Sequence, residues 1–559
     1  MIIDSREMTQ DSIIETSICI IGSGPAGVTL AKEFANLSNH VSLLESGGIS
    51  QEVDIQDLSD GEIIGDNFLC IKGTRNRQFG GNSNIWSIKL RRDKDSAWEM
   101  GVRYAPLDGI DFERRDWVPN SGWPISRKDL NPYYKKAQEA THSGPFAYDV
   151  ESWTSEQVKP FDFGSSPLTS KVYQFGPRKV FHQDSLEKLS AAPNIDIYTY
   201  ATVTDLDTAG EGSSIKQVRV SNSTGKDFWI RAKIFVLATG GIETARLMLA
   251  SNRHQEAGVG NEHDVVGRFF MDHPLVDMGR LFPASHHVFS QAAFYDKREI
   301  DGHSVMGHIA LTKEVMAEQQ LLNSAVVLFP RPSHRQTRAL LSLKTIVEDK
   351  ALNLSSPSSW PKSAQHLLNV AGGLDYLTRA ACVAKKYDQS FLPGFGRGGW
   401  AENPHIQNRF KMFEVLLVTE QAPDPSNQVK LSRNLDALGM PRVELNWKWG
   451  QFNIDIAKRT QSLFAEGVEK AGLGHFVSNF GDGEPSLPGP AGLAHHLGTT
   501  RMSASPQQGV VNENCRVHTV PNLYVASSSV FPTGGYTNPT LTILALALRL
   551  ADHLKNKLP

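Results

Sequence analysis

The feature that most constrains the fold of this chain is a glycine-rich turn near its N-terminal end. The turn, Gly22–Gly27, follows the apolar run Ser17–Ile21, whose composition is typical of a buried parallel strand. A segment with apolar residues at helical spacing continues to about Leu37, and a second apolar strand, Val41–Glu45, comes next. Strand, turn, helix and strand in this order predict a dinucleotide-binding α/β unit.

Each glycine of this turn has its own steric role in such a unit. Gly22 permits the tight turn, Gly24 lets the backbone approach a pyrophosphate, and Gly27 lets the helix pack closely on the strand. The helix N-terminus then faces the phosphates, and Glu45 can accept hydrogen bonds from both adenosine ribose hydroxyls. A glycine-rich turn in a nucleotide-free sheet is the alternative, and it leaves Glu45 unexplained.

Composition and charge exclude several classes of protein. A chain of 559 residues is too long for one core, so we expect two or three domains. Its 57 basic and 60 acidic residues leave a net charge of -3, which gives no electrostatic footprint for nucleic acid. The four cysteines are scattered, so neither a metal site nor a disulfide framework is expected. The sequence has no signal-peptide pattern and no apolar run of membrane-spanning length, which predicts a cytoplasmic protein without a membrane span.

Irregular, glycine-rich sequence follows the first unit. The segment 73–87 combines glycines, amides and hydroxyls without helical periodicity. Buried irregular backbone needs hydrogen-bond partners, and a polar cofactor would supply them. A surface turn is the alternative, which Phe79, Ile85 and Trp86 disfavour because their exposure would be costly. Strands at about Ile195–Val203 and Lys233–Ala238 then return the chain to the nucleotide sheet.

From about residue 276 to 486 the pattern changes to alternating apolar segments, which predict a mostly antiparallel sheet covered on one face by helices. The clearest segments are Val305–Leu311, Phe413–Val418 and Val443–Trp447, with a helix at Ile454–Ala471. Ser355–Ser359 has the composition of a linker. Pro393–Trp400 has the glycines and aromatic residues of a substrate lid, with an ordinary surface loop as an equal alternative.

Several separate segments together resemble the glucose-methanol-choline (GMC) oxidoreductase family, over nearly the whole chain. They are Gly22–Gly27 with Glu45, Gly80–Trp86, Asp116-Trp117, Gly122–Pro124, Ala238–Leu249, Val266–Arg268 and the C-terminal region from Ala494 to Thr542. Within the family, the helix start at Gly240–Leu247 and Gly122–Pro124 followed by Pro132–Tyr134 are similar to the bacterial sugar and polyol dehydrogenases and pyranose oxidase.

The resemblance implies an α/β protein in which a Rossmann-like FAD-binding domain is combined with a discontinuous α+β substrate domain, built on the antiparallel sheet. The expected limits are 1–135, 170–275 and 487–559 for the FAD-binding domain, 136–169 for a crossing segment on the substrate side, and 276–486 for the substrate domain. The FAD-binding residues implied are Gly22, Gly24, Pro25, Ala26, Gly27, Glu45, Ser46, Gly80, Gly81, Asn82, Ser83, Trp86, Ser87, Val203, Ala238, Thr239, Gly240, Ser527, Asn538 and Thr540.

Two positions depart from the family pattern, and one cluster of residues is missing. The histidine that links covalently to the flavin in pyranose oxidase-like proteins is replaced by Ile85, so we expect noncovalent FAD. An aspartate that many members carry near the last strand is Ser527, so a hydroxyl or backbone group must replace its contact. The cysteine cluster of the iron-sulfur branch is missing, which argues against an internal electron relay.

Oxidation of an alcohol requires a base that is neutral near pH 7, and histidine suits that role. The resemblance assigns the base to His495, ahead of the Gly498-Thr499 turn, and makes Asn538 its partner on the substrate oxygen. The adjacent His496 remains an alternative base, and either histidine could be a satisfied core residue. Asn538 could instead be a helix cap, because Pro539 follows at a favoured first helical position.

We therefore expect an FAD-dependent oxidoreductase that acts on a CH–OH group of a sugar, glycoside or polyol. A GMC-like flavoprotein with lyase or decarboxylase activity on a non-sugar substrate is the alternative, and a cofactor-free binding protein is a third class. Oxygen, a quinone and a redox protein all remain possible electron acceptors. The helix that begins at Pro539-Thr540 would place its positive end beside the flavin and stabilise negative charge on reduction.

Overall fold

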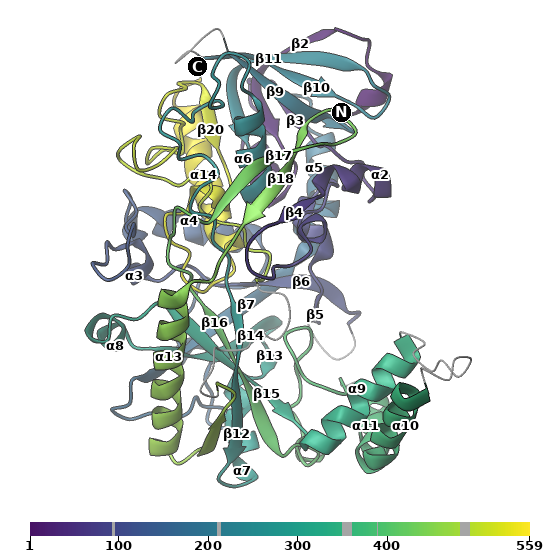
Figure 1. Ribbon diagram of the computed structural model, residues 1–559, viewed down its shortest axis with the longest axis vertical. Coiled ribbons are helices and arrows are strands. Elements are labelled where there is room, and N and C mark those ends of the chain that lie inside the picture. Colours follow the sequence, from purple (N-terminus) through teal and green to yellow (C-terminus); the bar gives the residue numbers. More distant parts are fainter. Residues whose placement is uncertain (92–95, 209–213, 349–359, 388–389, 481–491, 559) are drawn as a thin grey trace.

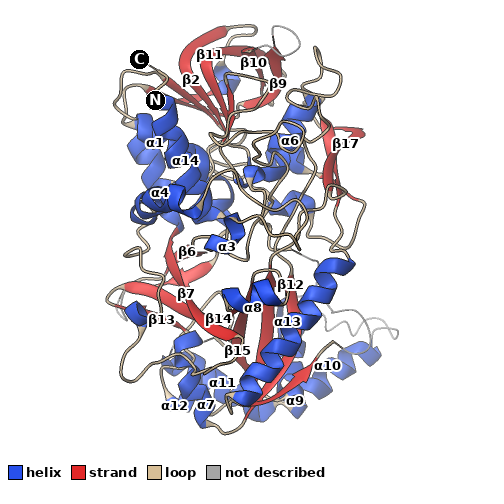
Figure 2. Cartoon of the chain, turned by 90° about the vertical axis from the view of Figure 1, so that its left-hand side faces the viewer, coloured by secondary structure: helices blue, strands red, loops and turns tan. Residues whose placement is uncertain are grey.

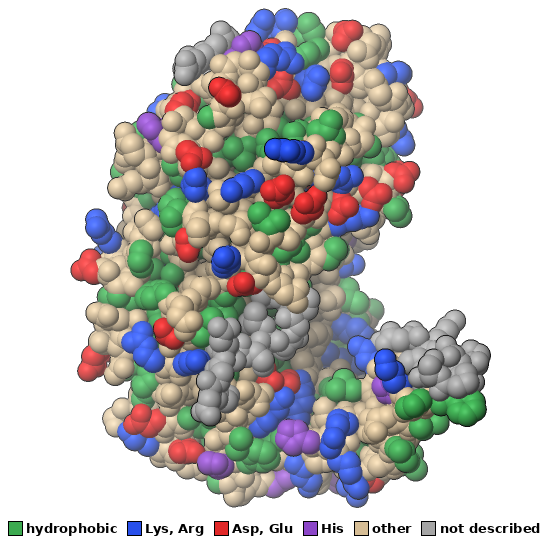
Figure 3. Space-filling view, viewed as in Figure 1, with side chains coloured by type: hydrophobic (Ala, Val, Ile, Leu, Met, Phe, Trp, Pro, Cys, Tyr) green, Lys and Arg blue, Asp and Glu red, His purple; other side chains and the backbone are tan. Residues whose placement is uncertain are grey.

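The computed structural model describes residues 1–91, 96–208, 214–348, 360–387, 390–480 and 492–558; the expected linker Ser355–Ser359 lies outside them. Figure 1 shows two stacked parts, and both chain termini lie in the upper one. The upper part is built on an eight-stranded sheet and the lower part on a nine-stranded sheet. Figure 3 shows the surface deeply indented between the upper part and a helical projection of the lower part.

The eight-stranded sheet has the order β1-β8-β3-β2-β11-β10-β9, and β20 pairs with β11. Its strands are β1 (Ile2–Asp4), β2 (Ile13–Ile21), β3 (Val41–Leu44), β8 (Ile195–Thr199), β9 (Thr202–Thr208), β10 (Ile215–Ser221), β11 (Asp227–Leu237) and β20 (Leu523–Val525). All neighbours pair in parallel except at β10, which is antiparallel to both β9 and β11. The buried residues of β2, Ile18–Ile21, are at most 4% exposed, as expected for a strand covered on both faces.

Helices cover this sheet. Helices α1 (Pro25–Phe34), α14 (Thr540–Lys555) and α4 (Arg127–Ala140) pack side by side, and α6 (Gly240–Ala250) lies across from them (Figure 2). Shorter helices of the first 200 residues are α2 (Val53–Gln56), α3 (Gly109–Phe112) and α5 (Gln183–Ser190). Because α1 belongs to the first fifty residues and α14 to the last twenty, the two chain ends share one helical layer.

The nine-stranded sheet has the order β19-β12-β16-β15-β14-β7-β6-β5, and β13 pairs with β14. Every pairing in it is antiparallel. Its strands are β5 (Ile88–Leu90), β6 (Glu99–Tyr104), β7 (Leu168–Pro177), β12 (Leu275–Pro283), β13 (Lys297–Ile300), β14 (His303–Leu311), β15 (Ser324–Arg331), β16 (Met412–Thr419) and β19 (Gly474–Ser478). The alternating segments Val305–Leu311 and Phe413–Val418 therefore lie in the predicted antiparallel sheet, and the mixed fold class is confirmed.

Helix α13 (Gln451–Lys470) runs along this sheet, and a bundle of α9 (His334–Glu348), α10 (Trp360–Gly372) and α11 (Leu374–Tyr387) projects from one end (Figures 1 and 2). The remaining helices of the lower part are α7 (His287–Gln291), α8 (Lys313–Glu318) and α12 (Pro404–Gln407). A small third sheet joins β17 (Gln428–Leu435), β18 (Pro441–Asn446) and β4 (Gly61–Ile63).

Two expected strands differ from the structure. The predicted strand Ile195–Val203 is interrupted at Tyr200, whose left-handed φ of 55° separates β8 from β9. The segment Val443–Trp447 contributes β18 to the small sheet instead of the nine-stranded one. The expected domain limits stay a prediction, and strands β5, β6 and β7 of the nine-stranded sheet come from chain segments before residue 178. Among the described helices, none is long and apolar enough to span a membrane.

Candidate active site

A cavity opens where the parallel strands β2, β3, β11 and β20 end, which is where ligands bind in sheets of this kind. Most of the predicted cofactor-binding residues line it. They are Gly22, Gly24, Pro25, Ala26, Glu45, Ser46, Gly81, Asn82, Trp86, Val203, Ala238, Thr239, Gly240, Ser527, Asn538 and Thr540. His495 also lies on its wall, so the structure brings the first and last segments of the chain to one cavity.

Four predicted residues do not line the cavity. Gly27 packs α1 against the turn, since a Cβ there would lie 1.9 Å from the Gly22 carbonyl oxygen. Gly80 has a φ of 91° and begins the short helical turn Gly81–Ile85, in which the buried Ser83 hydroxyl donates to the Gly80 carbonyl. Ser87 is exposed on the far side of this turn. Gly27, Gly80 and Ser83 therefore shape the wall from behind.

The glycine turn has the features of a phosphate cradle. Gly22 has a φ of 104°, and a Cβ there would lie 2.7 Å from the Ala238 carbonyl oxygen, so a side chain has no room. Nothing lies within 4 Å of a Cβ built on Gly24, which faces the open cavity. Three helices, α1, α6 and α14, begin at cavity residues without a side-chain cap. Their free N–H groups and positive dipole ends fit an anionic ligand.

Glu45 directly follows β3 on the cavity wall and is 5% exposed. Its Oε2 accepts hydrogen bonds from the Ser23 backbone N–H at 3.2 Å and the Ser23 hydroxyl at 2.6 Å, and its Oε1 accepts from Gly47 N–H at 2.9 Å. Burial raises the pKa of Glu45, while these donors lower it. The carboxylate thus holds the glycine turn. Both lone pairs of Oε2 are used by Ser23, and Oε1 retains one for a ligand hydroxyl.

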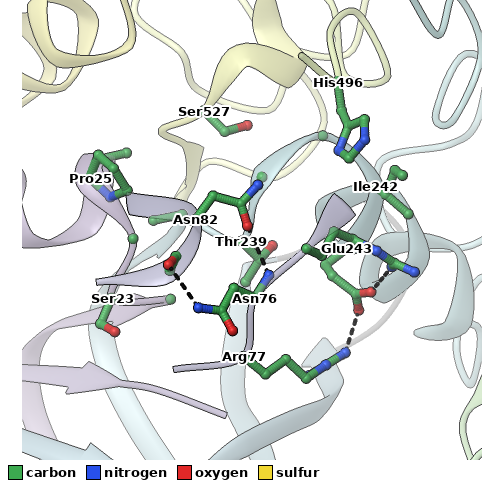
Figure 4. Close-up of a pocket in the computed structure, with 18 of the residues that line it drawn as sticks. Ser23, Pro25, Asn76, Arg77, Asn82, Thr239, Ile242, Glu243, His496 and Ser527 are labelled. Carbon is green, nitrogen blue, oxygen red and sulfur yellow. Dashed lines mark hydrogen bonds and ion pairs between the residues drawn. The ribbon is translucent and has the colours of Figure 1, made fainter. Parts of the chain in front are cut away.

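An ion-pair cluster that the sequence did not predict lies beside the cavity floor. Glu243, in the first turn of α6, is paired with Arg75 and, at 2.8 Å, with Arg77 (Figure 4). Arg77 also donates to the Ser46 hydroxyl at 2.6 Å. Burial would raise the pKa of Glu243, but the neighbouring guanidinium groups outweigh it and hold that pKa at about 2. The cluster fastens the irregular segment 73–87 to α6, and Arg75, Arg77 and Glu243 all line the cavity.

His495 and Asn538 lie together at the other end of the cavity. The Asn538 Nδ2 and His495 Nε2 atoms are 3.2 Å apart, and the His495 Nδ1 atom lies 2.8 Å from Nδ1 of His273. Asn538 Oδ1 accepts from Arg103 Nε at 2.8 Å. Ala494, just before the histidine, has a left-handed φ of 58°, a conformation that costs an L-residue about 1 kcal/mol. Such strain at the wall of a cavity is typical of a functional site.

His496 has different surroundings from His495. It packs against the rings of Phe68 and Phe270, and a Cβ on Gly241 of α6 would lie 2.7 Å from its own Cβ. Burial lowers the pKa of His496 and of His273 to about 3, and burial followed by the charges of its neighbours lowers that of His495 well below 6.5. All three imidazoles are therefore neutral at pH 7, as a base must be before it takes a proton.

Three further expectations concern Ser527, Ile85 and the segment Pro393–Trp400. The Ser527 hydroxyl lies 2.6 Å from that of Ser529 and accepts the Ser529 backbone N–H at 3.1 Å, so two of its hydrogen bonds are already made where it lines the cavity. Ile85, at the position of the linking histidine, is 45% exposed. In the segment proposed as a lid or a surface loop, Trp400 is 2% exposed and Phe395 stacks over the Arg103 guanidinium at 4.7 Å. Pro393–Trp400 is thus packed on the nine-stranded sheet.

Arg103 and His273 are the site residues that the sequence reasoning missed. Arg103 lies in β6, which has no signal beyond a short apolar alternation. His273 lies in Asp272-His273-Pro274, directly after the Val266–Arg268 segment used for the family resemblance, and a histidine between an acid and a proline was the available signal.

The chain is similar over most of its length to proteins of known function and structure. Residues 423–547 match the family model described as GMC oxidoreductase. The chain is 33% identical to paromamine 6'-oxidase of Streptomyces fradiae, over 97% of this chain and 92% of that protein. It is 26% identical to the fructose dehydrogenase large subunit of Gluconobacter japonicus, over 88% of this chain and 84% of the relative. Its fold is similar to that of Aspergillus oryzae formate oxidase, solved in work on FAD modification, with a TM-score of 0.50, 18% identity and 99% coverage of both chains.

Proposed function

The chain belongs to the GMC oxidoreductase family, and from that premise we propose that it oxidises a CH–OH group of a sugar, glycoside or polyol to a carbonyl. The observation that carries the proposal is the placement of His495 and Asn538 at one end of a cavity whose other end is a glycine turn closed by Glu45. Members of the family are FAD enzymes, and the cavity fits that cofactor.

The fit rests on the donor set of the cavity. The uncapped N-termini of α1 and α6 and the open backbone at Gly24 would hold the diphosphate. The Glu45 carboxylate would accept from the ribose of the adenosine half. Residues of α14, beginning at Thr540, would lie beside the isoalloxazine ring and favour negative charge there. Ile85 offers no imidazole for a covalent link, which supports noncovalent binding.

When bound, FAD supplies the acceptor for the hydride that leaves the substrate carbon. The protein's part is to bind the hydroxyl and remove its proton. Asn538 Nδ2 donates to the substrate oxygen while His495 Nε2 accepts the hydroxyl proton, and a base placed in this way contributes about 100- to 10,000-fold in rate. His273, behind His495, keeps the imidazole ring in place.

Oxygen, a quinone and a redox protein all fit the proposal as acceptors. None of the residues that line the described cavity specifically favours the alternative of a lyase or decarboxylase. His495 and Asn538 supply the base and the amide donor that the oxidation of an alcohol requires.

The test is a rapid-mixing experiment without oxygen on the FAD-loaded enzyme. A screen of sugars, glycosides and polyols first identifies a substrate that bleaches the flavin. His495→Ala should then slow bleaching by about 100-fold or more with FAD retained, and hydroxide should partly restore it at high pH. His496→Ala is the matched control, expected to alter substrate affinity or stability. Equal or reversed effects would move the base to His496, and no bleaching by any alcohol would refute the oxidation itself.

A further inference from the structure

We propose that Arg103 and His273 are positioning residues, which together impose one direction on the hydrogen bonds of the active site and so keep the Nε2 atom of His495 free to accept the substrate proton. The inference rests on the proposed function, because it assumes that His495 is the base. It adds two residues from elsewhere in the chain and states which nitrogen of His495 carries the proton.

Arg103 sets the direction of the hydrogen bonds that run through Asn538 to His495. A guanidinium group can donate hydrogen bonds and cannot accept them. Arg103 Nε lies 2.8 Å from the Asn538 side chain, so the amide oxygen must face the arginine. The amide nitrogen therefore faces His495, and its N–H points at Nε2 at 3.2 Å. Asn538 alone could turn its amide either way, and Arg103 removes that freedom.

The next step fixes the tautomer of His495. Because Nε2 receives an N–H from Asn538, it must carry a lone pair in the neutral ring, and the ring proton must lie on Nδ1. That Nδ1–H donates to Nδ1 of His273 at 2.8 Å. His273 accepts at Nδ1 and so carries its own proton on Nε2, beside the backbone of Gly534. A substrate hydroxyl that enters between the two side chains then accepts the N–H of Asn538 and offers its own proton to the Nε2 lone pair of His495, in place of the hydrogen bond between them.

The structure holds both positioning residues rigidly. Arg103 is 4% exposed, and its guanidinium carbon lies over the rings of Tyr173 at 4.3 Å and Phe395 at 4.7 Å. It makes no ion pair with any described carboxylate, so no acid competes for its Nε. Burial and contact with two rings restrict the guanidinium and support its charge by cation–π attraction.

Asp272 binds the two histidine segments together. Its Oδ1 accepts backbone N–H bonds from His273 at 2.6 Å, Leu493 at 3.0 Å and His495 at 3.1 Å. One carboxylate oxygen thus fixes the spacing between segments that are 222 residues apart in sequence. The short distance between Nδ1 of His273 and Nδ1 of His495 therefore follows from these backbone hydrogen bonds to Asp272 as well as from the two side chains.

Arg103 and His273 also act on the charge of His495. Its pKa is lowered first by burial, then by His273 and Arg103, with His496 contributing last. Loss of the arginine charge raises the pKa of His495 and brings protonation of the base to higher pH. Loss of the donor direction instead allows the proton to occupy Nε2, which lowers the rate at every pH. The two effects can be separated experimentally.

The experiment compares conservative and disruptive variants of the FAD-loaded enzyme. His273→Asn keeps an acceptor oxygen close to the place of Nδ1, whereas His273→Phe keeps the ring volume without an acceptor. Arg103→Lys keeps a donor-only cation, whereas Arg103→Met removes it. His475→Asn, at an exposed histidine of β19, is the control. Flavin reduction without oxygen is followed from pH 5 to 9, and nitrogen NMR of ¹⁵N-histidine protein reports which His495 nitrogen is protonated, assigned with His495→Ala.

We expect wild-type His495 to be protonated at Nδ1 at pH 7. His273→Asn and Arg103→Lys should stay within about threefold of wild type, and His273→Phe and Arg103→Met should lose about 100-fold, the scale of a base that is unavailable. The pH at which flavin reduction slows in acidic solution should be higher in Arg103→Met than in the wild type and unchanged in Arg103→Lys. His495 protonated at Nε2 in the wild type overturns the inference without any variant. His273→Phe as fast as wild type, or His273→Asn as slow as His273→Phe, also overturns it. If His495→Ala reduces the flavin as fast as the wild type, His495 is not the base and the proposed function itself is refuted.

Discussion

Removal of the Glu45 carboxylate should have two effects, one on the affinity for FAD and one on the stability of the protein. In the proposed complex the free lone pair of Oε1 accepts a hydrogen bond from a ribose hydroxyl, worth roughly 1.5 to 3 kcal/mol for a charged acceptor. Each 1.4 kcal/mol is tenfold in affinity. Glu45→Ala should therefore raise the dissociation constant of FAD by about tenfold or more.

The second effect is structural. Glu45 also accepts from the backbone N–H groups of Ser23 and Gly47 and from the Ser23 hydroxyl. A buried donor left without an acceptor costs roughly 1 to 3 kcal/mol, so the flavin-free variant should unfold at lower temperature as well. Glu45→Gln, which keeps one acceptor oxygen, should be intermediate in both properties.

The assay is a titration of flavin-free protein with FAD, followed by flavin fluorescence, beside thermal unfolding of the same samples. Glu62→Ala, at an exposed glutamate of β4, is the control and should leave both values unchanged. A folded Glu45→Ala protein whose FAD dissociation constant stays within about threefold of wild type would show that the carboxylate does not hold the ribose.

Three further outcomes are expected. Acid precipitation should leave the yellow flavin in the supernatant, because Ile85 cannot form a histidyl link; colour retained in the washed pellet contradicts this. Glu420→Gln should destabilise the protein by about 3 to 5 kcal/mol in denaturant unfolding, since it breaks a bidentate pair with Arg115 in which both side chains are at most 1% exposed; a loss below about 1 kcal/mol would count against the pair. Because burial keeps the pKa of His495 well below 6.5, flavin reduction should be constant from pH 8 to 6.5 and fall only in more acidic solution, where the imidazole gains a proton; a midpoint at or above pH 6.5 would contradict that shift.

Features set by local backbone geometry could be predicted from the sequence. The turn at Gly22 and the strand ending at Glu45 obey short-range steric rules, so their elements were predicted to within a few residues. The break at Tyr200 was missed because the apolar pattern continues across it, and a left-handed φ at a tyrosine has no sequence signature.

Side chains that meet across the fold were beyond sequence reasoning. Arg103 reaches Asn538 from a strand 435 residues earlier in the chain, and His273 reaches His495 across 222 residues. Periodicity reports which face of an element is apolar, and it carries no information on which polar residues of two distant elements will touch. The Glu243 pairs with Arg75 and Arg77 were missed for the same reason.

The pairing of β20 with β11, and the packing of α14 between α1 and α4, have a consequence for biosynthesis. A ribosome makes the glycine turn long before Ser527, Asn538 and Thr540, which complete the cavity wall. Until β20 and α14 are made, Phe235–Leu237 of β11 lack their pairing partner and the helical layer stays open, a state prone to aggregation. Retention of FAD should therefore require synthesis of β20 and α14, and fragments that end before Leu523 should neither keep the flavin nor stay in solution.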